Sequence, residues 1–255
     1  MAEETTLFRT ELPVDPEIEE MIQAGVFFGR KKSKTNPKMQ EFVFGNRGGI
    51  EIIDLYATQG SLERALTFLK EKVHAGALTL FVGTQPMAQG VEALAKEFGF
   101  PFVTKRWLGG TLTNFKTLEE RILHFKKLKT DLASGVLQKY TKKERVEFEK
   151  EIHKLSELFG GLEALEKLPE VLVVVDPVVH HTATREAKRA RIPIVAFANT
   201  DADPDGIQYL VPGNTKSAKS IAWFLEKIRA AIQEGKLMPA AGETKEEKPD
   251  TAPHE

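Results

Sequence analysis

Short apolar runs alternate with longer amphipathic stretches along most of the chain. Runs with the length and β-branched content of buried strands lie at residues 78–82, 102–103, 171–176 and 194–198. Apolar spacing of three and four predicts helices at residues 17–25, 58–75, 86–98, 181–191 and 218–232. Because strands that alternate with helices form parallel sheets, we predict an α/β fold with a mainly parallel sheet flanked by helices.

Residues 42–55, FVFGNRGGIEIIDL, are extended but interrupted. Residues 46–49 carry a turn signal that predicts two strands with a tight connection. The segment before them, residues 25–39, is basic and bounded by glycine, and we expect a loop there. The sheet is expected to hold about five strands.

The middle of the chain has a different pattern, with two apolar stripes among many lysines. The first stripe is Phe115, Leu118, Ile122, Phe125, Leu128 and Leu132, and the second is Phe148, Ile152, Leu155, Phe159 and Leu162. Residues 133–135, Ala-Ser-Gly, separate them. This pattern predicts an antiparallel helical hairpin of coiled-coil type that projects from the body. Two ordinary surface helices are the alternative.

These patterns divide the chain into four parts. We expect an acidic N-terminal segment at residues 1–20, an α/β domain from residues 21–110 and 163–233, an inserted hairpin at residues 111–162, and a disordered tail at residues 234–255. No stretch is apolar enough for a membrane span, and the N-terminus lacks the apolar core of an export signal. The absence of cysteine excludes disulfides and thiolate metal sites, and a cytoplasmic protein is expected.

Charge is unevenly distributed along the chain. The whole chain has 36 basic and 37 acidic residues, whereas residues 21–233 hold 32 basic and 24 acidic ones. The body therefore carries about eight net positive charges between two acidic ends. This favours a polyanionic partner, although an ordinary basic surface has the same composition.

Motifs for nucleotide chemistry are absent. The sequence lacks the Gly-x-Gly-x-x-Gly fingerprint, the Walker loop and Gly-x-Ser-x-Gly. An enzyme acting on a nucleotide or sugar phosphate remains open, because parallel sheets bind ligands at their strand ends. The residues there would be Gly83, Thr84, Asp176 and Asp203.

Three other polar groups favour structural roles over chemistry. His180 and His181 lack ligand-spaced partners, which favours a surface or capping pair over a metal site. The alternating acids at 201, 203 and 205 lack the distal glutamate of a calcium loop and predict a polar loop. Residues 213–217, GNTKS, predict a turn and an N-cap, with binding of one anion as the alternative. We expect no catalytic residue, no bound metal and no cofactor.

Basic residues gather in three separate clusters. The first lies on the expected loop and consists of Arg30, Lys31, Lys32, Lys34 and Lys38. The second, Arg185, Lys188 and Arg189, shares one helix face with His181. Lys105 and Arg106 form the third. Several clusters suit a large, shaped polyanion better than a small phosphate ligand, and solvated surface residues are the alternative.

The third cluster opens the segment RWLGGTLTNF, residues 106–115. Its double glycine permits a sharp turn from a strand into the predicted hairpin. Thr113, Asn114 or Thr117 is expected to cap the following helix, and Thr117 with Glu120 fits a capping box. Trp107 would either stack on a base or, as we favour, pack at the root of the hairpin.

The segment RWLGGTLTNF also resembles a signature of bacterial small-subunit ribosomal protein two, the universal uS2 family. Further matches follow in the same order over residues 25–229. They are NPKM at 36–39, IEIIDL at 50–55, FVGT at 81–84, LP at 168–169 followed by VLVVVDP, DP at 203–204 and PGN at 212–214. The resemblance implies a flavodoxin-like sheet with a protruding helical hairpin and no catalytic activity.

The resemblance also implies a place between the head and body of the small ribosomal subunit. The expected partners are small-subunit ribosomal RNA and other ribosomal proteins, including the large first protein of the subunit, which the family helps to recruit. No membrane and no small-molecule substrate are expected. Together with the basic clusters, this gives a set of candidate RNA-binding residues: Arg30, Lys31, Lys32, Lys34, Lys38, Arg47, Lys105, Arg106, Trp107, Asn114, Arg185, Lys188 and Arg189.

The chain departs from the family pattern at several polar positions. Phe27 and Arg30 stand where the family commonly has histidine, and Thr35 stands in place of tryptophan. Residues 199–201 read Asn-Thr-Asp instead of Asp-Thr-Asn, and residues 215–216 read Thr-Lys instead of Asp-Asp. The family roles of those histidines and aspartates therefore do not transfer, and a metal at that loop is not expected.

Overall fold

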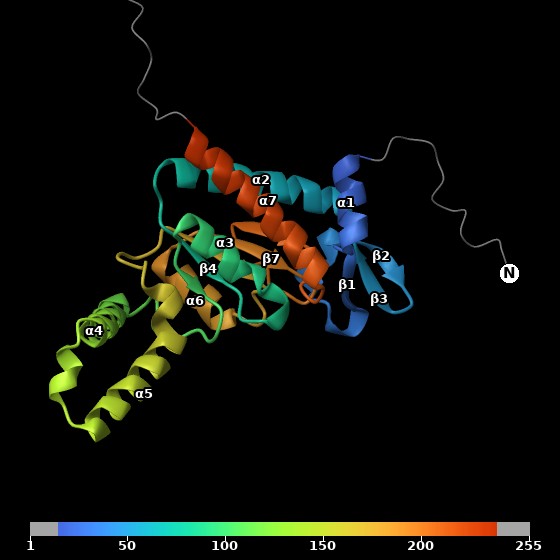
Figure 1. Ribbon diagram of the computed structural model, residues 1–255. Helices are drawn as coiled ribbons and strands as arrows, with labels where there is room; N and C mark the ends of the chain where they lie inside the picture. The colour runs from blue at the N-terminus through green and yellow to red at the C-terminus, as the bar shows by residue number, and fades with distance from the viewer. Residues whose placement is uncertain (1–14, 239–255) are drawn as a thin grey trace, which may run out of the picture.

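Five parallel strands form the central sheet of the protein (Figure 1). The computed structural model describes residues 15–238, apart from the side chain of Gln138. The strands are β4 (Thr79–Val82), β5 (Phe102–Val103), β6 (Val171–Val175), β7 (Ile194–Ala198) and β8 (Tyr209–Pro212), in the order β5-β4-β6-β7-β8. The first strand of this sheet lies between its second and third, which is the flavodoxin-like order. The predicted fold class is confirmed.

Helices cover both faces of this sheet (Figure 1). One layer contains α1 (Pro16–Ala24), α2 (Leu55–His74), α3 (Gly90–Phe98) and α7 (Ala218–Leu237), and the other contains α4 (Phe115–Ala133), α5 (Lys142–Phe159) and α6 (His181–Ala190). Side chains of β6 alternate between the two cores: Val173 packs with the first layer and Val174 with the second. All five residues of β6 are buried, which explains its unbroken apolar sequence.

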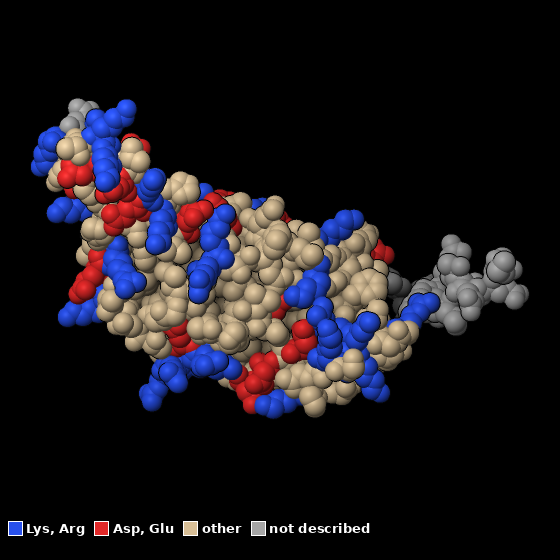
Figure 2. Space-filling view, turned by 90° about the horizontal axis from the view of Figure 1, so that it is seen from below, with Lys and Arg blue, Asp and Glu red and all other residues tan. Residues whose placement is uncertain are grey.

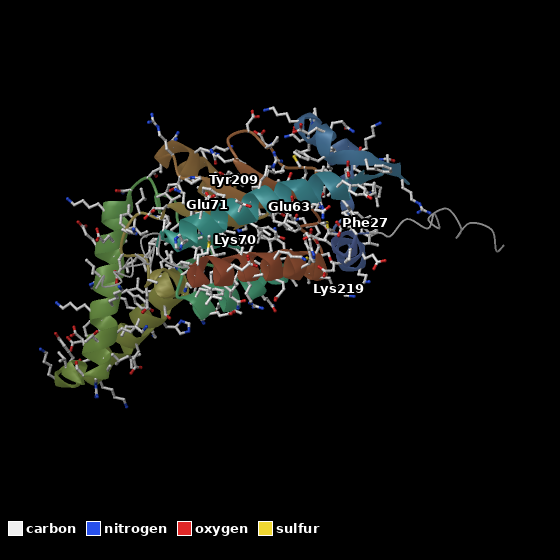
Figure 3. All side chains as sticks on the ribbon, turned by 90° about the horizontal axis from the view of Figure 1, so that it is seen from above. Phe27, Glu63, Lys70, Glu71, Tyr209 and Lys219 are labelled. Atoms are coloured by element: carbon white, nitrogen blue, oxygen red, sulfur yellow. The ribbon has the colours of Figure 1, made fainter. Side chains whose placement is uncertain are left out.

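Helices α2 and α7 lie side by side over the sheet (Figure 3). Gly235 permits this approach, because a Cβ atom there would lie 2.8 Å from the carbonyl oxygen of Lys70. The α7 helix therefore continues to Leu237, past the start of the expected tail at residue 234. Residues 1–14 and 239–255, which hold most of the two predicted terminal segments, lie outside the described residues.

Strand β8 is absent from the sequence prediction, which assigns its residues to no element after the acidic loop. It is only four residues long, and Pro212 closes it. A proline cannot donate to a strand ladder and is confined to edges and ends, so the local sequence weakens the strand signal. The strand forms because it pairs with β7, from Val195 with Tyr209 to Ala198 with Pro212. The local sequence alone does not predict it.

A second, antiparallel sheet forms from the N-terminal part of the chain. It contains β1 (Phe28–Lys31), β2 (Val43–Arg47) and β3 (Ile50–Ile53), in the order β1-β3-β2. The two predicted strands of residues 42–55 are present. The expectation of a loop over residues 25–39 is wrong, because β1 pairs with the free edge of β3, and the short helical turns η1 (Lys32–Lys34) and η2 (Pro37–Phe42) follow it.

The helices α4 and α5 project from the body and are linked by the turn η4 (Val136–Lys139) (Figure 1). In Figure 1, α4 is seen nearly end-on and α5 lengthwise, so their axes cross, and packing of the coiled-coil type is not confirmed. The stripe of α4 is buried in the second core, through Leu118, Ile122 and Phe125. The base of this insertion is therefore part of the body.

Candidate nucleic-acid interface

One carboxylate organises the loop of the segment RWLGGTLTNF. Glu186, on α6, is 7% exposed. One of its oxygens accepts hydrogen bonds from Trp107 Nε1 at 3.1 Å and the Gly110 amide at 2.9 Å. The other oxygen accepts from the amides of Leu112 at 3.0 Å and Thr113 at 3.3 Å and from the Thr113 hydroxyl at 3.3 Å. We call this loop, residues 107–113, the Glu186 loop.

Burial alone would raise the pKa of Glu186, but the backbone hydrogen bond from Leu112 and the others from Trp107, Gly110 and Thr113 hold it below its ordinary value. Glu186 therefore stays ionised near neutral pH. Gly110 has a φ of 91°, a backbone conformation that glycine adopts readily and residues with a side chain rarely adopt. The predicted glycine turn is thus present. The anion that the amides of this loop bind is the carboxylate of Glu186, a group of the protein itself.

The structure favours the packing role for Trp107. Its indole N–H bonds to Glu186, and its partly buried ring packs against the second core. Lys105 and Arg106, immediately before it, are exposed and make no ion pair with any residue from 15 to 238. Both lie between the carboxyl end of β5 and the Glu186 loop.

Asn114 is exposed and occupies the N-cap position of α4, but its side chain caps no backbone amide. It accepts a hydrogen bond from the Thr117 hydroxyl at 3.0 Å instead. The predicted capping box of Thr117 and Glu120 is wrong, because the N-cap position is Asn114, three residues before Thr117. A capping box does form at the start of α5, between Thr141 and Glu144.

The basic residues around β1 divide into two groups. Arg30 and Lys38 are ion-paired to the loop after β7: Arg30 Nε lies 3.1 Å from Asp201 Oδ2, and Lys38 Nζ pairs with Asp203 at 3.4 Å and with Asp205. The acids of that loop thus form the predicted polar loop. The second group is exposed and has no ion-pair partner among the described residues: Lys31, Lys32, Lys34 and Arg47.

The basic face of α6 is exposed as predicted. Arg185, Lys188 and Arg189 face solvent together with His181, while Ala183 and Ala187 are buried against the second core. Figure 2 looks onto the helix layer that contains α6. It shows Lys and Arg side chains gathered over the projecting helices and near the three-stranded sheet, with acidic side chains among them.

Helix α6 connects the three clusters. Through Glu186 it holds the loop that follows Lys105 and Arg106. The side chain of Lys188 packs against Gly206, where a Cβ atom would lie 2.9 Å from it. Gly206 is in the same loop as the acids that pair with Lys38. The fold therefore brings clusters that are distant in sequence to the two sides of one helix.

The strand ends at the topological switch point, between β4 and β6, are filled by protein side chains. Asp176 has a φ of 65° and its side chain is 3% exposed. Its Oδ2 accepts from Gln85 Nε2 at 2.7 Å, Lys216 Nζ at 2.7 Å and Thr215 Oγ1 at 3.0 Å. Burial alone would raise the pKa of Asp176, but hydrogen bonds from Lys216 and Gln85 lower it below its ordinary value.

His180 completes this network. Of its expected roles, surface or capping, the surface one is wrong; His180 occupies the N-cap position of α6, but its side chain makes no capping bond. It is 3% exposed, whereas His181 is exposed. The Thr84 amide donates to His180 Nε2 at 3.1 Å, so the ring proton lies on Nδ1, 2.9 Å from the carbonyl oxygen of Asp176. Burial lowers the pKa of His180, which is therefore neutral near pH 7. Thr84 and Asp176 thus serve the protein's own hydrogen bonds, which disfavours the nucleotide-enzyme interpretation.

The motifs that carry the resemblance have mostly architectural roles. Asp54 of IEIIDL caps α2 by accepting from the Tyr56 amide at 2.9 Å, and Asn36 of NPKM accepts from the Lys38 amide at 3.0 Å. Asn214 of PGN donates to the carbonyl of Gly25 at 3.2 Å, and Ser217 caps α7. The predicted turn and N-cap at residues 213–217 are confirmed.

Neither a metal cluster nor a membrane span is found in the described part of the chain. No three His, Asp or Glu side chains among residues 15–238 lie in positions to hold an ion. No helix in the same range combines the length and apolar character needed to cross a bilayer.

Known proteins with similar sequences point to one family. The family model "Ribosomal protein S2" matches residues 21–235. The small ribosomal subunit protein uS2 of Thermus thermophilus is 39% identical over 217 residues, 85% of each chain. The proteins of the same name from Geotalea uraniireducens and Francisella tularensis subsp. novicida are 41% and 40% identical, over 86% and 89% of this chain and 86% and 96% of theirs. The chain therefore belongs to the ribosomal protein S2 family.

Proposed function

We propose that this protein binds small-subunit ribosomal RNA through the basic clusters on the two sides of α6, and that it also binds neighbouring ribosomal proteins. Family membership makes it a structural protein of the small ribosomal subunit, not an enzyme. The connection of the clusters by α6 is the observation that supports RNA binding. Phosphate contacts dominate such interfaces and require exposed cations held at fixed positions. A cytoplasmic, ribosome-bound location follows from this role.

Reconstitution tests the proposal. Purified protein should enter small subunits that are assembled from their RNA and the remaining proteins, and should co-sediment with them in a sucrose gradient. Its RNA affinity should fall with salt, with a slope of about 0.7 to 0.9 per phosphate contact. A protein that stays at the top of the gradient while the other proteins assemble would contradict the proposal.

The variant Lys105→Ala/Arg106→Ala should keep its fold and lose RNA affinity. Both side chains are exposed and without an ion-pair partner in the range described, so their loss removes charge but no packing. The salt slope should fall by about 1.4 to 1.8, the contribution of two phosphate contacts. Filter binding at several salt concentrations measures this, and circular dichroism checks the fold.

Lys142→Ala/Lys143→Ala is a matched control, because this pair is also adjacent, basic and exposed but lies at the start of α5. It should leave the slope unchanged. If the Lys105/Arg106 variant unfolds instead, these two residues support the fold, and the RNA-binding role assigned to them is wrong.

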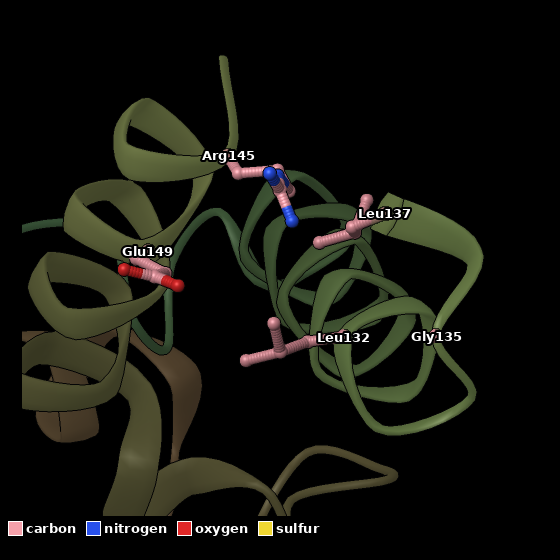
Figure 4. Close-up of a pocket in the computed structure, with 5 residues that line it drawn as sticks. All are labelled: Leu132, Gly135, Leu137, Arg145 and Glu149. Carbon is pink, nitrogen blue, oxygen red and sulfur yellow. The ribbon is translucent and has the colours of Figure 1, made fainter. Parts of the chain in front are cut away.

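The tip of the projecting helices suits a protein partner. A hollow of about 160 Å³ lies between the end of α4 and the start of α5 (Figure 4). Leu132 and Leu137 line it together with Arg145 and Glu149. Val136 and Val146 nearby are each 42% exposed. Exposed apolar side chains with a polar rim are typical of a protein interface. The partner that the resemblance implies is the large first protein of the subunit.

The variant Val136→Asp/Val146→Asp should lose the protein partner and keep RNA affinity. Each aspartate would place a charge on the apolar surface that the partner has to desolvate. Calorimetry with the purified first protein of the subunit measures the loss. Point substitutions are preferable to deletion of the projecting helices, residues 116–158, because the deletion would also remove Leu118, Ile122 and Phe125 from the second core. If the variant binds the partner as tightly as the wild-type protein does, the contact lies elsewhere.

A further inference from the structure

The antiparallel sheet leaves one face open to solvent. Ile50 and Ile52 lie on the same side of β3, because they are two residues apart. Phe28 pairs with Ile52, and Lys31 and Arg47 both pair with Ile50, so their side chains share this side. Phe28 is 45% exposed and Ile50 is 38% exposed. We call this surface the outer face of the three-stranded sheet.

The opposite side of the same sheet packs on the body. Glu51 and Ile53 are 3% and 1% exposed. A Cβ atom on Gly29 would lie 3.0 Å from the side chain of Thr200, in the loop after β7, which shows how closely the sheet approaches the body. The one acidic residue of these strands thus faces inward, so the strands place no carboxylate on the outer face.

Cations border the apolar centre of the outer face. Lys31 and Arg47 lie at its far end, on both sides of Ile50. Next to them is a hollow of about 290 Å³, lined by Gly29, Arg30, Lys31, Lys34 and Ile50. An aromatic ring, an aliphatic surface and a cationic hollow therefore occur together within one small sheet.

We propose that the outer face of the three-stranded sheet binds unpaired nucleotides of RNA. A base stacks on Phe28 and the adjacent isoleucines, and the following phosphate lies in the hollow between Lys31 and Lys34, within reach of Arg47. Single-stranded RNA is bound in this manner elsewhere, by aromatic residues on an open sheet with cations for the backbone. The inference rests on the proposed function and specifies the kind of RNA segment bound.

Charge and chemistry favour this occupant over others. A duplex keeps its bases stacked inside the helix and offers no free base to Phe28. An apolar protein segment would cover the isoleucines but leave the surrounding cations buried and unpaired, which is costly. An acidic peptide is the remaining competitor, and cross-linking in assembled subunits separates it from RNA.

Short RNA strands provide the first test. The full-length protein should bind a single-stranded oligouridine with one central 2-aminopurine more tightly than an RNA duplex of equal length. Binding should quench the 2-aminopurine as it stacks. Phe28→Leu should abolish the quenching and weaken binding at least about fivefold, since stacking on an aromatic side chain contributes about that much or more per base. Phe28→Trp should restore both.

Two further variants serve as controls for this test. Tyr140→Leu removes an aromatic side chain of similar exposure, 38%, from the projecting helices and should change nothing. Lys31→Ala/Arg47→Ala should lower the salt slope by about 1.4, as expected for two contacts to a single strand. Unchanged quenching and affinity in Phe28→Leu, or equal affinity for the duplex, would overturn the inference.

Cross-linking in assembled subunits separates this inference from the proposed function. Ultraviolet irradiation of reconstituted small subunits should attach a nucleotide to the peptide that contains residues 28–50. If that peptide is instead joined by a chemical cross-linker to another protein and carries no nucleotide, the outer face binds protein and the inference is wrong. Failure of the wild-type protein to enter subunits at all would refute the proposed function.

Discussion

Replacing Glu186 with alanine is expected to lower the free energy of unfolding by about 3 kcal/mol. The change would leave the amides of Gly110 and Leu112 and the indole N–H of Trp107 without their acceptor. Each buried donor that loses its partner costs about 1–3 kcal/mol, and water will reach those at the edge of the loop. Urea unfolding followed by circular dichroism measures the loss. Arg185→Ala, at the preceding position but exposed, should change stability by no more than about 0.5 kcal/mol.

The ionisation of Glu186 adds a pH signature. Its pKa in the folded protein is lowered by hydrogen bonds from the Leu112 amide and the other donors of the loop, against the effect of burial. Its contribution to stability is therefore full above the ordinary glutamate pKa and is lost as the pH falls through the lower folded value. Glu186→Gln should remove this part of the acid dependence. A variant with unchanged acid dependence would contradict the assigned role.

Replacing Asp176 with alanine should be about equally damaging, at about 3 kcal/mol. The change removes the buried acceptor of Gln85, Thr215 and Lys216 and leaves the ammonium group without its counter-ion. Breaking a buried pair by removing one partner typically costs about 3–5 kcal/mol, and the partial exposure of Lys216 places this case at the lower end. The same urea titration measures the effect.

Two further variants test this explanation. Asp176→Ala/Lys216→Met should be more stable than Asp176→Ala alone, because the unpaired charge is gone. Asp203→Ala, which breaks the exposed pair with Lys38, should cost less than about 1 kcal/mol. If the double variant is no more stable than the single one, the pairing of Asp176 with Lys216 is not the cause of the loss.

The elements with strong hydrophobic periodicity were predictable from the sequence. Helix α2 and strand β6 bury residues at the spacing that the sequence shows, and the structure places them within a few residues of the prediction. Strands β1 and β8 were not predictable. Each is an edge strand of four residues whose pairing partner, β3 or β7, determines its conformation. Local sequence carries little of that information.

The exposed residues of the candidate interface were predictable from the sequence, whereas the buried residues that support them were not. Exposed cations are visible in composition and spacing, and all three clusters of them face solvent in part. The role of Glu186 was not visible, because the amide of Leu112 that it accepts from is 74 positions away in sequence. Its one local signal is an acid on the small-residue face of α6, between Ala183 and Ala187. The buried position of His180 likewise depends on Thr84, from another strand end.

The attachment of the N-terminal sheet has a consequence for synthesis. The amide of Arg30 bonds to the side chain of Thr200, 170 positions later, and the ion pairs of Arg30 and Lys38 use the same late loop. At about 5–20 residues per second, roughly 10–30 s pass between translation of the two partners. During that interval the basic N-terminal region of each nascent chain has lysines and arginines but none of these carboxylates. Attachment of the N-terminal sheet through these contacts therefore waits until translation has passed Asp205.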